Sequence, residues 1–333
     1  MASSRTVQPG EMPKLTGRTS ASPPGQNEMV PADDFEVRPR RSLMSRAPLT
    51  FRYQDDTDSS LGSDTESSTA SVSASILEYR RRQGRTYHSD KFTSNYFLPN
   101  DDQQQVLDVG TGSGDEFADR HPNTEVIGTD LSPCQPQWMP PNLRFEIDDA
   151  VVQPWAWKED YFDFIHMRYL FGTIKDWNAL FKEAYRCCAP GGWVQSAEAD
   201  VRFRSDDGST ELEPIFKTYQ KLLEEGSRII GNPFFVHELQ QKAFKEAGFT
   251  DIKTVDYKFP VGGWPKDPKL AGIGHFVKTT LENDLEGYTL MMWQDVCKWP
   301  EDEYQVALMS LRKAIRNPKV HSYMTVRYVY GRK

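Results

Sequence analysis

The sequence predicts an α/β protein with a Rossmann-like sheet, helices on both faces of the sheet and a helical cap inserted before the last strand. Three observations carry this prediction. Short apolar runs alternate with stretches of helical periodicity, a glycine-rich loop follows the first apolar run, and helical segments separate the last two strands. Continuous apolar strands joined through helices are typical of a parallel sheet that is covered on both faces.

The first 75 residues are rich in Ser, Pro, Asp and Thr and poor in aromatic and branched apolar side chains. Such a segment has too little apolar surface to offset the entropy lost on ordering, so we expect a disordered tail over 1–75 and a folded domain over 76–333. Two basic runs, "RPRR" from Arg38 and "YRRRQGR" from Tyr79, resemble import signals. Short basic runs are more often solvated surface.

Five apolar runs are expected to form the strands of the sheet. In chain order they are "QVLDVG", "EVIGTD", "LRFEIDD", "FDFIHMR" and "GWVQSAEAD". Between the fourth and fifth runs, apolar side chains recur at i, i+3, i+4, i+7, i+8 and i+11 from Trp177 to Cys188, which predicts a helix packed on the sheet. "APGG" is expected to end this helix.

After the fifth strand the order of elements changes. Helices are predicted over Glu211–Arg228 and Val236–Ala247, and the strand "TDIKTVDYKF" follows them. Two further helical segments, Lys269–Trp299 and Glu301–Arg316, precede the last strand, "SYMTVRYVYG". They cannot all belong to the sheet layers, so we expect cap helices at about 207–235 and 266–316.

Composition and charge restrict the class of function. The 333 residues carry a formal net charge of −8, with a pI of about 5.4, so direct nucleic-acid binding is not expected. The absence of an apolar run of 18 residues and of a signal-peptide pattern predicts a soluble intracellular protein without a membrane span. The four cysteines form no CxxC pair, so we expect free thiols and no metal site.

The loop "VLDVGTGSG" contains the strongest site signal. Glycines at 110, 112 and 114 let the backbone approach a ligand, and Asp130 ends the second strand at the spacing expected for a carboxylate that binds ribose hydroxyls. A dinucleotide site requires glycine where this chain has Asp115, and a P-loop requires Gly-Lys-Ser/Thr, which is absent. S-adenosylmethionine carries no phosphate and tolerates an acidic rim, so it is the ligand that these residues favour, although a tight structural turn explains a lone GxGxG nearly as well.

Several longer motifs resemble one family. "SILEYRRRQGRTYHSDKF", "EVIGTDLSPCQPQWMPPNLRFEIDD", "YKFPVGGWPKDPKLAGIG" and "HSYMTVRYVYGRK" are similar to segments of the fungal LaeA-like methyltransferases, and the resemblance runs from about Ser75 to the C-terminus. It implies a class I methyltransferase fold, S-adenosylmethionine as methyl donor, regulation of secondary metabolism or development, and a location in the nucleus and cytoplasm. It also implies protein partners, either a velvet-type regulator or a second methyltransferase subunit in a hetero-oligomer.

The resemblance also implies roles for particular residues. The glycine loop would line the methionine moiety, Asp130 the ribose, Asp148 and Asp149 the adenine edge, and Tyr87 would close over the cofactor. The complete set of expected cofactor-binding residues is Tyr87, Asp108, Gly110, Thr111, Gly112, Gly114, Asp130, Leu131, Asp148 and Asp149. No catalytic residue is assigned, because methyl transfer from a sulfonium can proceed mainly through positioning. His166, Arg168 and Glu198 lie at strand ends where an acceptor would bind, or serve only as hydrogen-bonded rim residues.

The chain departs from the family pattern beside the glycine loop. "DEFADR" is the whole of the first helix, less than two turns, and about thirty residues that family members carry before the first strand are missing. A helix this short offers a weak dipole and little packing surface, so cofactor binding is in question. Three hypotheses therefore stay open: a regulatory methyltransferase, an interaction subunit with impaired cofactor binding, and a tailoring enzyme with an apolar pocket near Trp264, Phe276, Met291, Met292 and Trp293.

Overall fold

The computed structural model describes residues 79–83, 85–87, 89, 97, 100, 115–131 and 139–333. The expected disordered tail, the first predicted strand and the glycine loop lie outside the described residues.

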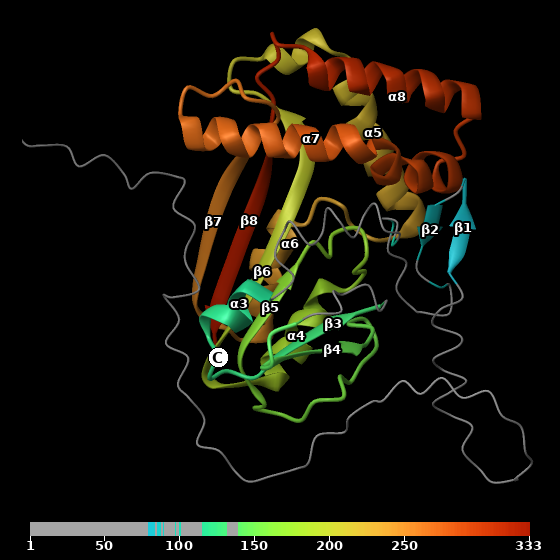
Figure 1. The fold of residues 1–333 in the computed structure, drawn as a ribbon. Helices are drawn as coiled ribbons and strands as arrows, with labels where there is room; N and C mark the ends of the chain where they lie inside the picture. Colours follow the sequence, from blue (N-terminus) through green and yellow to red (C-terminus); the bar gives the residue numbers. More distant parts are fainter. Residues whose placement is uncertain are drawn as a thin grey trace, which may run out of the picture.

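The described strands form three sheets (Figure 1). β3 (Val126–Asp130) pairs with β4 (Leu143–Ile147) in parallel, and β5 (Phe162–Arg168) pairs in parallel with β6 (Cys188–Arg204). A short antiparallel hairpin, β1 (Arg80–Arg82) and β2 (Arg85–Tyr87), makes up the third sheet. Four of the five predicted runs therefore become strands, the first lying outside the described residues, and the parallel pairing expected for them holds within both of these pairs.

The last two strands make the sheet mixed. β8 (Tyr323–Arg332) lies between β6 and β7 (Thr250–Pro260) and is antiparallel to both. The cap lies at one end of the sheet, so the chain that leaves it must run back along the sheet toward the opposite end (Figure 1). Within the described four-stranded sheet, this return strand departs from the parallel arrangement that the apolar runs predicted, because an apolar run does not encode strand direction.

Helices α4 (Trp177–Cys187) and α6 (His237–Ala247) pack against each other beside the sheet. Asp176 caps α4 through its side chain, which accepts a hydrogen bond from the Ala179 backbone N–H at 3.0 Å. The predicted apolar stripe of α4 is buried except for Tyr185, which is half-buried, and the helix is confirmed to within one residue. α4 ends at Cys187 and β6 begins at Cys188, so "APGG" lies inside the strand and does not end the helix as predicted.

The cap consists of α5 (Ile215–Ile230), α7 (Pro268–Leu290), the π-helical turn η3 (Met291–Val296) and α8 (Glu301–Arg316). α7 and α8 cross the end of the sheet where β6 ends and β8 begins (Figure 1). The predicted helix over Lys269–Trp299 is in fact divided, because Asp284 leaves the helical region and a π-helix begins at Met291. The helix predicted from Glu211 begins later, at Ile215 after Pro214, and a 3₁₀ turn, η2 (Ser209–Leu212), precedes it.

In the part of the chain that the structure describes, no helix combines the length and apolar character that crossing a bilayer requires.

Candidate functional site

The carboxyl ends of β3 and β4 bring two of the predicted site residues together. Asp130 is the last residue of β3, and its carbonyl accepts a hydrogen bond from the Asp148 backbone N–H at 3.0 Å. Leu131 follows Asp130 and is half-buried. The two aspartates therefore flank one edge of the sheet, at the ends of adjacent parallel strands.

Asp149 has a different environment from its neighbours. Its side chain is only 5% exposed, and Oδ1 accepts a hydrogen bond from the Val151 backbone N–H at 3.0 Å. Asp148 Oδ1 in turn accepts from the Asp149 N–H at 2.9 Å. Asp149 thus stabilises the turn after β4, whereas Asp130 and Asp148 are less buried. Carboxylates are hydrogen-bond acceptors only, so this rim suits the donors of a ligand that carries ribose hydroxyls and an exocyclic amine.

Helix α3 (Asp115–Arg120) is as short as the sequence predicts. Ala118 is fully buried, and the Phe117 ring stacks on Phe164 of β5 at 5.9 Å between centroids. Among the described side chains of α3, its packing therefore rests on one methyl group and one ring, and Asn142 Nδ2 donates a hydrogen bond to the Ala118 carbonyl at 3.0 Å.

The remaining residues of the predicted glycine loop cannot be placed. Asp108, Gly110, Thr111, Gly112 and Gly114 lie outside the described residues, so their expected contacts with a cofactor stay predictions.

Tyr87 lies in β2 and is 3% exposed. Arg85 in the same strand forms an ion pair with Asp284 of the cap, so β2 is held beneath the cap. The expected role of Tyr87 over the cofactor stays a prediction.

Glu198 lies on β6 in a fully buried position. Its Oε2 accepts a hydrogen bond from the Phe171 backbone N–H at 2.9 Å, and its Oε1 has no hydrogen-bond partner among the described residues. Burial raises the pKa of this carboxyl to about 8, against the lowering effect of the Phe171 and Leu170 backbone N–H groups. Glu198 therefore carries a proton at pH 7 and supports the loop after β5 as a neutral acid.

His166 and Arg168 lie on β5, which pairs with β6, the strand that carries Glu198. His166 is exposed, and Arg168, the last residue of β5, lies 6.0 Å from the centroid of the Tyr169 ring. The charge of Arg168 acts on the His166 imidazole, so these two residues share one electrostatic environment.

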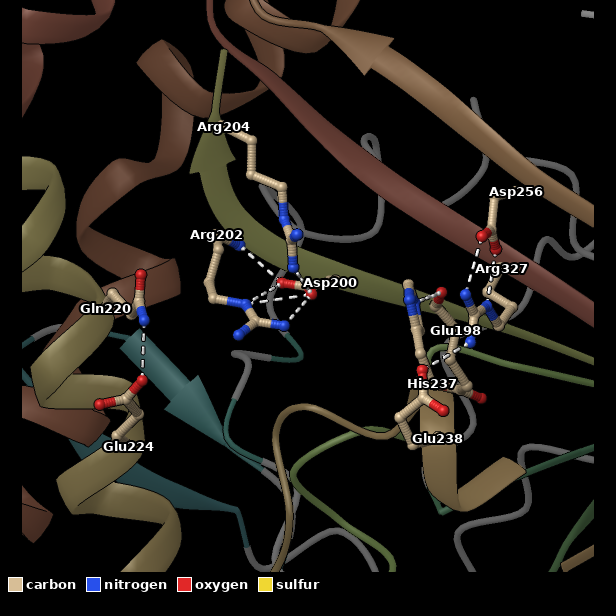
Figure 2. A network of polar contacts seen from close by, with 10 residues as sticks. All are labelled: Glu198, Asp200, Arg202, Arg204, Gln220, Glu224, His237, Glu238, Asp256 and Arg327. Atoms are coloured by element: carbon tan, nitrogen blue, oxygen red, sulfur yellow. Dashed lines mark hydrogen bonds and ion pairs between the residues drawn. The ribbon is translucent and has the colours of Figure 1, made fainter. Parts of the chain in front are cut away.

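The end of β6 carries a charged group that the sequence analysis did not single out (Figure 2). The buried Asp200 accepts hydrogen bonds from both Arg202 and Arg204, and the Arg202 guanidinium lies 4.1 Å from the centroid of the Phe235 ring. Burial works against ionisation of Asp200, but the hydrogen bond from Arg202 and the charges of both arginines lower its pKa overall. The alternation in "EADVRFR" places these side chains on one face of the strand, and this period of two is the signal that could have identified them.

A second charged group continues beside it in Figure 2. His237, the first residue of α6, contacts the Glu198 carbonyl through Nε2 at 2.9 Å, and burial lowers the pKa of its imidazole. Arg327 of β8 pairs with Asp256 of β7 at 2.6 Å and with Glu238 at 3.2 Å. These contacts link α6 to β7 and β8, the antiparallel pair of strands in the sheet.

The five apolar residues considered for a tailoring pocket differ in burial. Met292 and Trp293 are buried in the core, whereas Trp264 and Phe276 are 38% and 52% exposed. Met292 and Trp293 therefore serve as core side chains, and an apolar pocket formed by the set stays a prediction.

The mixed sheet, its rim of aspartates and the helical cap are the features of a class I methyltransferase. Residues 79–254 match the family described as a methyltransferase domain. A methyltransferase named pytC from Aspergillus terreus is 32% identical over 292 residues, which cover 78% of this chain and 89% of that protein. The secondary metabolism regulator LAE1 of Cochliobolus heterostrophus is 30% identical over 229 residues, 67% of this chain and 75% of that protein. The protein-methionine methyltransferase laeA of Emericella nidulans is 25% identical over 288 residues, 77% of each chain.

The chain belongs to the methyltransferase family and is LaeA-like within it. The predicted fold class, the methyltransferase activity and S-adenosylmethionine as cofactor are thereby confirmed. Among these relatives, some are named regulators of secondary metabolism, and others are named methyltransferases with no regulatory role in the name.

Proposed function

We propose that this protein is a regulatory S-adenosylmethionine-dependent methyltransferase of fungal secondary metabolism or development, acting in the nucleus and cytoplasm within a protein complex. The observation that carries the proposal is the meeting of Asp130 and Asp148 at the ends of adjacent parallel strands, joined by a 3.0 Å backbone hydrogen bond. LaeA-type regulators among the relatives support the regulatory part. A velvet-type regulator or a second methyltransferase subunit is the partner we expect.

The cofactor supplies an electrophilic methyl group, and the chain supplies its placement. In this proposal the Asp130 carboxylate accepts hydrogen bonds from the ribose hydroxyls, and Asp148, the less buried of the two following aspartates, accepts from the adenine amine. Leu131 contacts the adenine ring beside them. Asp149 acts on the same edge by holding the turn that carries Asp148.

Calorimetric titration with S-adenosylmethionine and S-adenosylhomocysteine tests this assignment. Asp130→Ala is expected to weaken binding by about 1.5 to 3 kcal/mol, the usual contribution of hydrogen bonds to a charged group, which is roughly tenfold to 150-fold in Kd. Asp119→Ala on α3 is the matched control, since it removes an exposed aspartate elsewhere on the same domain. Unchanged affinity in a folded Asp130→Ala protein would remove Asp130 from the site.

A second candidate is a tailoring enzyme that methylates a small metabolite. The observation in its favour is the similarity to pytC, which is named only as a methyltransferase and exceeds the LaeA-type relatives in identity, at 32% against 25 to 30%. Incubating the purified protein with methyl-labelled cofactor and either the protein fraction or the small-molecule fraction of a fungal extract separates the two. Label in protein supports the regulatory enzyme, and label in a small molecule supports the tailoring enzyme.

A third candidate is an interaction subunit with impaired cofactor binding. The six-residue α3, which buries one methyl group and one ring, is the observation that favours it. Absence of measurable binding by the isolated chain, with binding restored by a partner subunit, would support this candidate.

A further inference from the structure

The β1–β2 hairpin is attached to the cap through one buried ion pair. Arg85 Nη1 and Nη2 donate to Asp284 Oδ1 and Oδ2 at 2.5 and 2.9 Å, so the contact is bidentate. The side chains are 15% and 2% exposed. Paired geometry of this kind fixes both the distance and the orientation of the two partners.

Asp284 occupies the kink of α7. Its φ and ψ of −137° and 39° interrupt the helix, and its Oδ1 also accepts a hydrogen bond from the Gly287 backbone N–H at 3.1 Å. A Cβ at position 287 would lie 2.3 Å from the Asp284 carboxylate, so glycine is what allows this close approach. The carboxylate that binds Arg85 therefore also begins the helical stretch that leads into η3.

Two weaker contacts lie beside this pair. Gln83 Nε2 donates to Gln294 Oε1 of η3 at 3.0 Å and to Glu301 Oε2 at 3.1 Å. Arg82 pairs with Asp295 at 2.8 Å, with both side chains well exposed. All three residues of the hairpin that carry these contacts point to the kinked part of the cap.

Two described residues after the hairpin contact β2 and the loop after β5. The Asn100 backbone N–H donates to the Thr86 carbonyl at 2.9 Å, which joins Asn100 to β2. The Phe97 ring lies 5.7 Å from Phe171, in the loop after β5, and 4.8 Å from Phe234. Asn100 is therefore held against the strand that carries Arg85, and Phe97 packs on the loop after β5.

We propose that the Arg85–Asp284 ion pair is a positioning pair, which couples the kinked half of the cap to β2 and to Asn100, which is hydrogen-bonded to β2. In this arrangement a change at the cap alters the placement of Tyr87 and Asn100, and cofactor binding in turn stabilises the cap. The proposal rests on the proposed function, because it needs S-adenosylmethionine to bind at the rim near Asp130. Neither residue contacts the reacting atoms.

Charge-neutral replacement separates this role from simple structural support. Arg85→Met alone leaves the Asp284 carboxylate buried without its cation and is expected to destabilise the fold. The double variant Arg85→Met/Asp284→Asn removes both charges, and its asparagine can still accept from Gly287. Arg82→Ala is the matched control, because it removes an arginine and an exposed ion pair from the same hairpin.

S-adenosylhomocysteine is titrated calorimetrically into each full-length protein, and hydrogen exchange of amides 285–290 is measured with and without it. We expect the double variant to melt near wild type, to bind about tenfold more weakly and to lose the protection of these amides on ligand addition. Arg82→Ala should match wild type within about twofold. Arg85→Lys keeps the charge without the bidentate geometry, so its affinity for S-adenosylhomocysteine should lie between those of wild type and the double variant. It replaces the double variant in the test if that protein does not fold.

The two proposals fail in different ways. If wild type binds the probe, and Arg85→Met/Asp284→Asn and Arg85→Lys bind it equally well with the same protection of amides 285–290, the coupling is overturned and the proposed function stands. If wild type does not bind the probe, the proposed function falls and the coupling falls with it.

Discussion

At the scale of single residues, two buried carboxyl groups on β6 have different protonation states. Asp200 is ionised because two arginines bind it, whereas Glu198, two residues earlier, has only backbone N–H donors and retains its proton. Neither state is visible in the sequence, which shows only that both side chains share a face of a strand. The partner of each carboxylate comes from folding, and so does its pKa.

The raised pKa of Glu198 makes stability depend on pH. The folded state keeps this proton up to about pH 8, and the unfolded chain releases it near 4.5. Between these values the unfolded state binds fewer protons, so stability falls as pH rises, by about 1.4 kcal/mol per pH unit from this group alone. Glu198→Gln removes the titration. The melting temperature of the variant minus that of wild type should therefore increase from pH 5 to pH 8.

Thermal melts of both proteins across that range measure the effect. Glu159→Gln is the control, since Glu159 is exposed. Parallel melting curves for wild type and Glu198→Gln at every pH would show that this carboxyl is ionised in the folded protein.

At the scale of elements, the sequence predicts what is locally determined. The strands and α4 follow from apolar runs and from the spacing of buried side chains within a dozen residues. The hairpin and its ion pair do not follow, because Arg85 and Asp284 are 199 positions apart and each alone resembles an ordinary surface charge. The antiparallel return of β8 was missed for a similar reason, since its direction is set by where the cap lies. At the site, Asp130 and Asp148 could be placed on one edge from strand order, whereas the Asp200 cluster also depends on partners that only the fold brings together, such as Phe235 beside Arg202.

Helix α3 gives a prediction at this scale. A loop that presents backbone donors to a ligand is usually held by a helix packed on the sheet, and here Phe117 and Ala118 provide that packing. Fixing each loose loop residue costs about 1 to 2 kcal/mol, so two or three such residues would subtract several kcal/mol from binding. Inserting three apolar-biased, helix-forming residues after Gly114 should therefore tighten cofactor binding by at least about tenfold.

Titrating both proteins with S-adenosylmethionine decides the point. Insertion of Gly-Ser-Gly at the same place lengthens the chain without favouring a helix and is the control. Micromolar binding by the unmodified chain, with no gain on helical insertion, would show that the short helix is sufficient and would remove the main support for the interaction-subunit candidate.

At the scale of the whole molecule, the composition of the chain separates its two parts. The folded part concentrates the aromatic side chains that fill the core, with Trp293, Tyr304 and Phe181 among the largest that are fully buried. Residues 1–74 have few side chains of this kind, so little of the free energy of folding can come from them. Deleting residues 1–74 is therefore expected to leave the melting temperature within a few degrees of the full chain, while partner binding or nuclear entry is reduced.

A side-chain truncation in the cap serves as the comparison for the tail deletion. Leu308→Ala on α8 removes a side chain that is 1% exposed, which should cost about 2 to 5 kcal/mol and lower the melting temperature by roughly 4 to 20 °C for a domain of this size. If the tail deletion lowers the melting temperature as much as Leu308→Ala does, the tail packs on the domain. In that case its Ser, Pro and acidic residues must bind charged or polar groups of the domain, because apolar burial cannot account for a loss of that size.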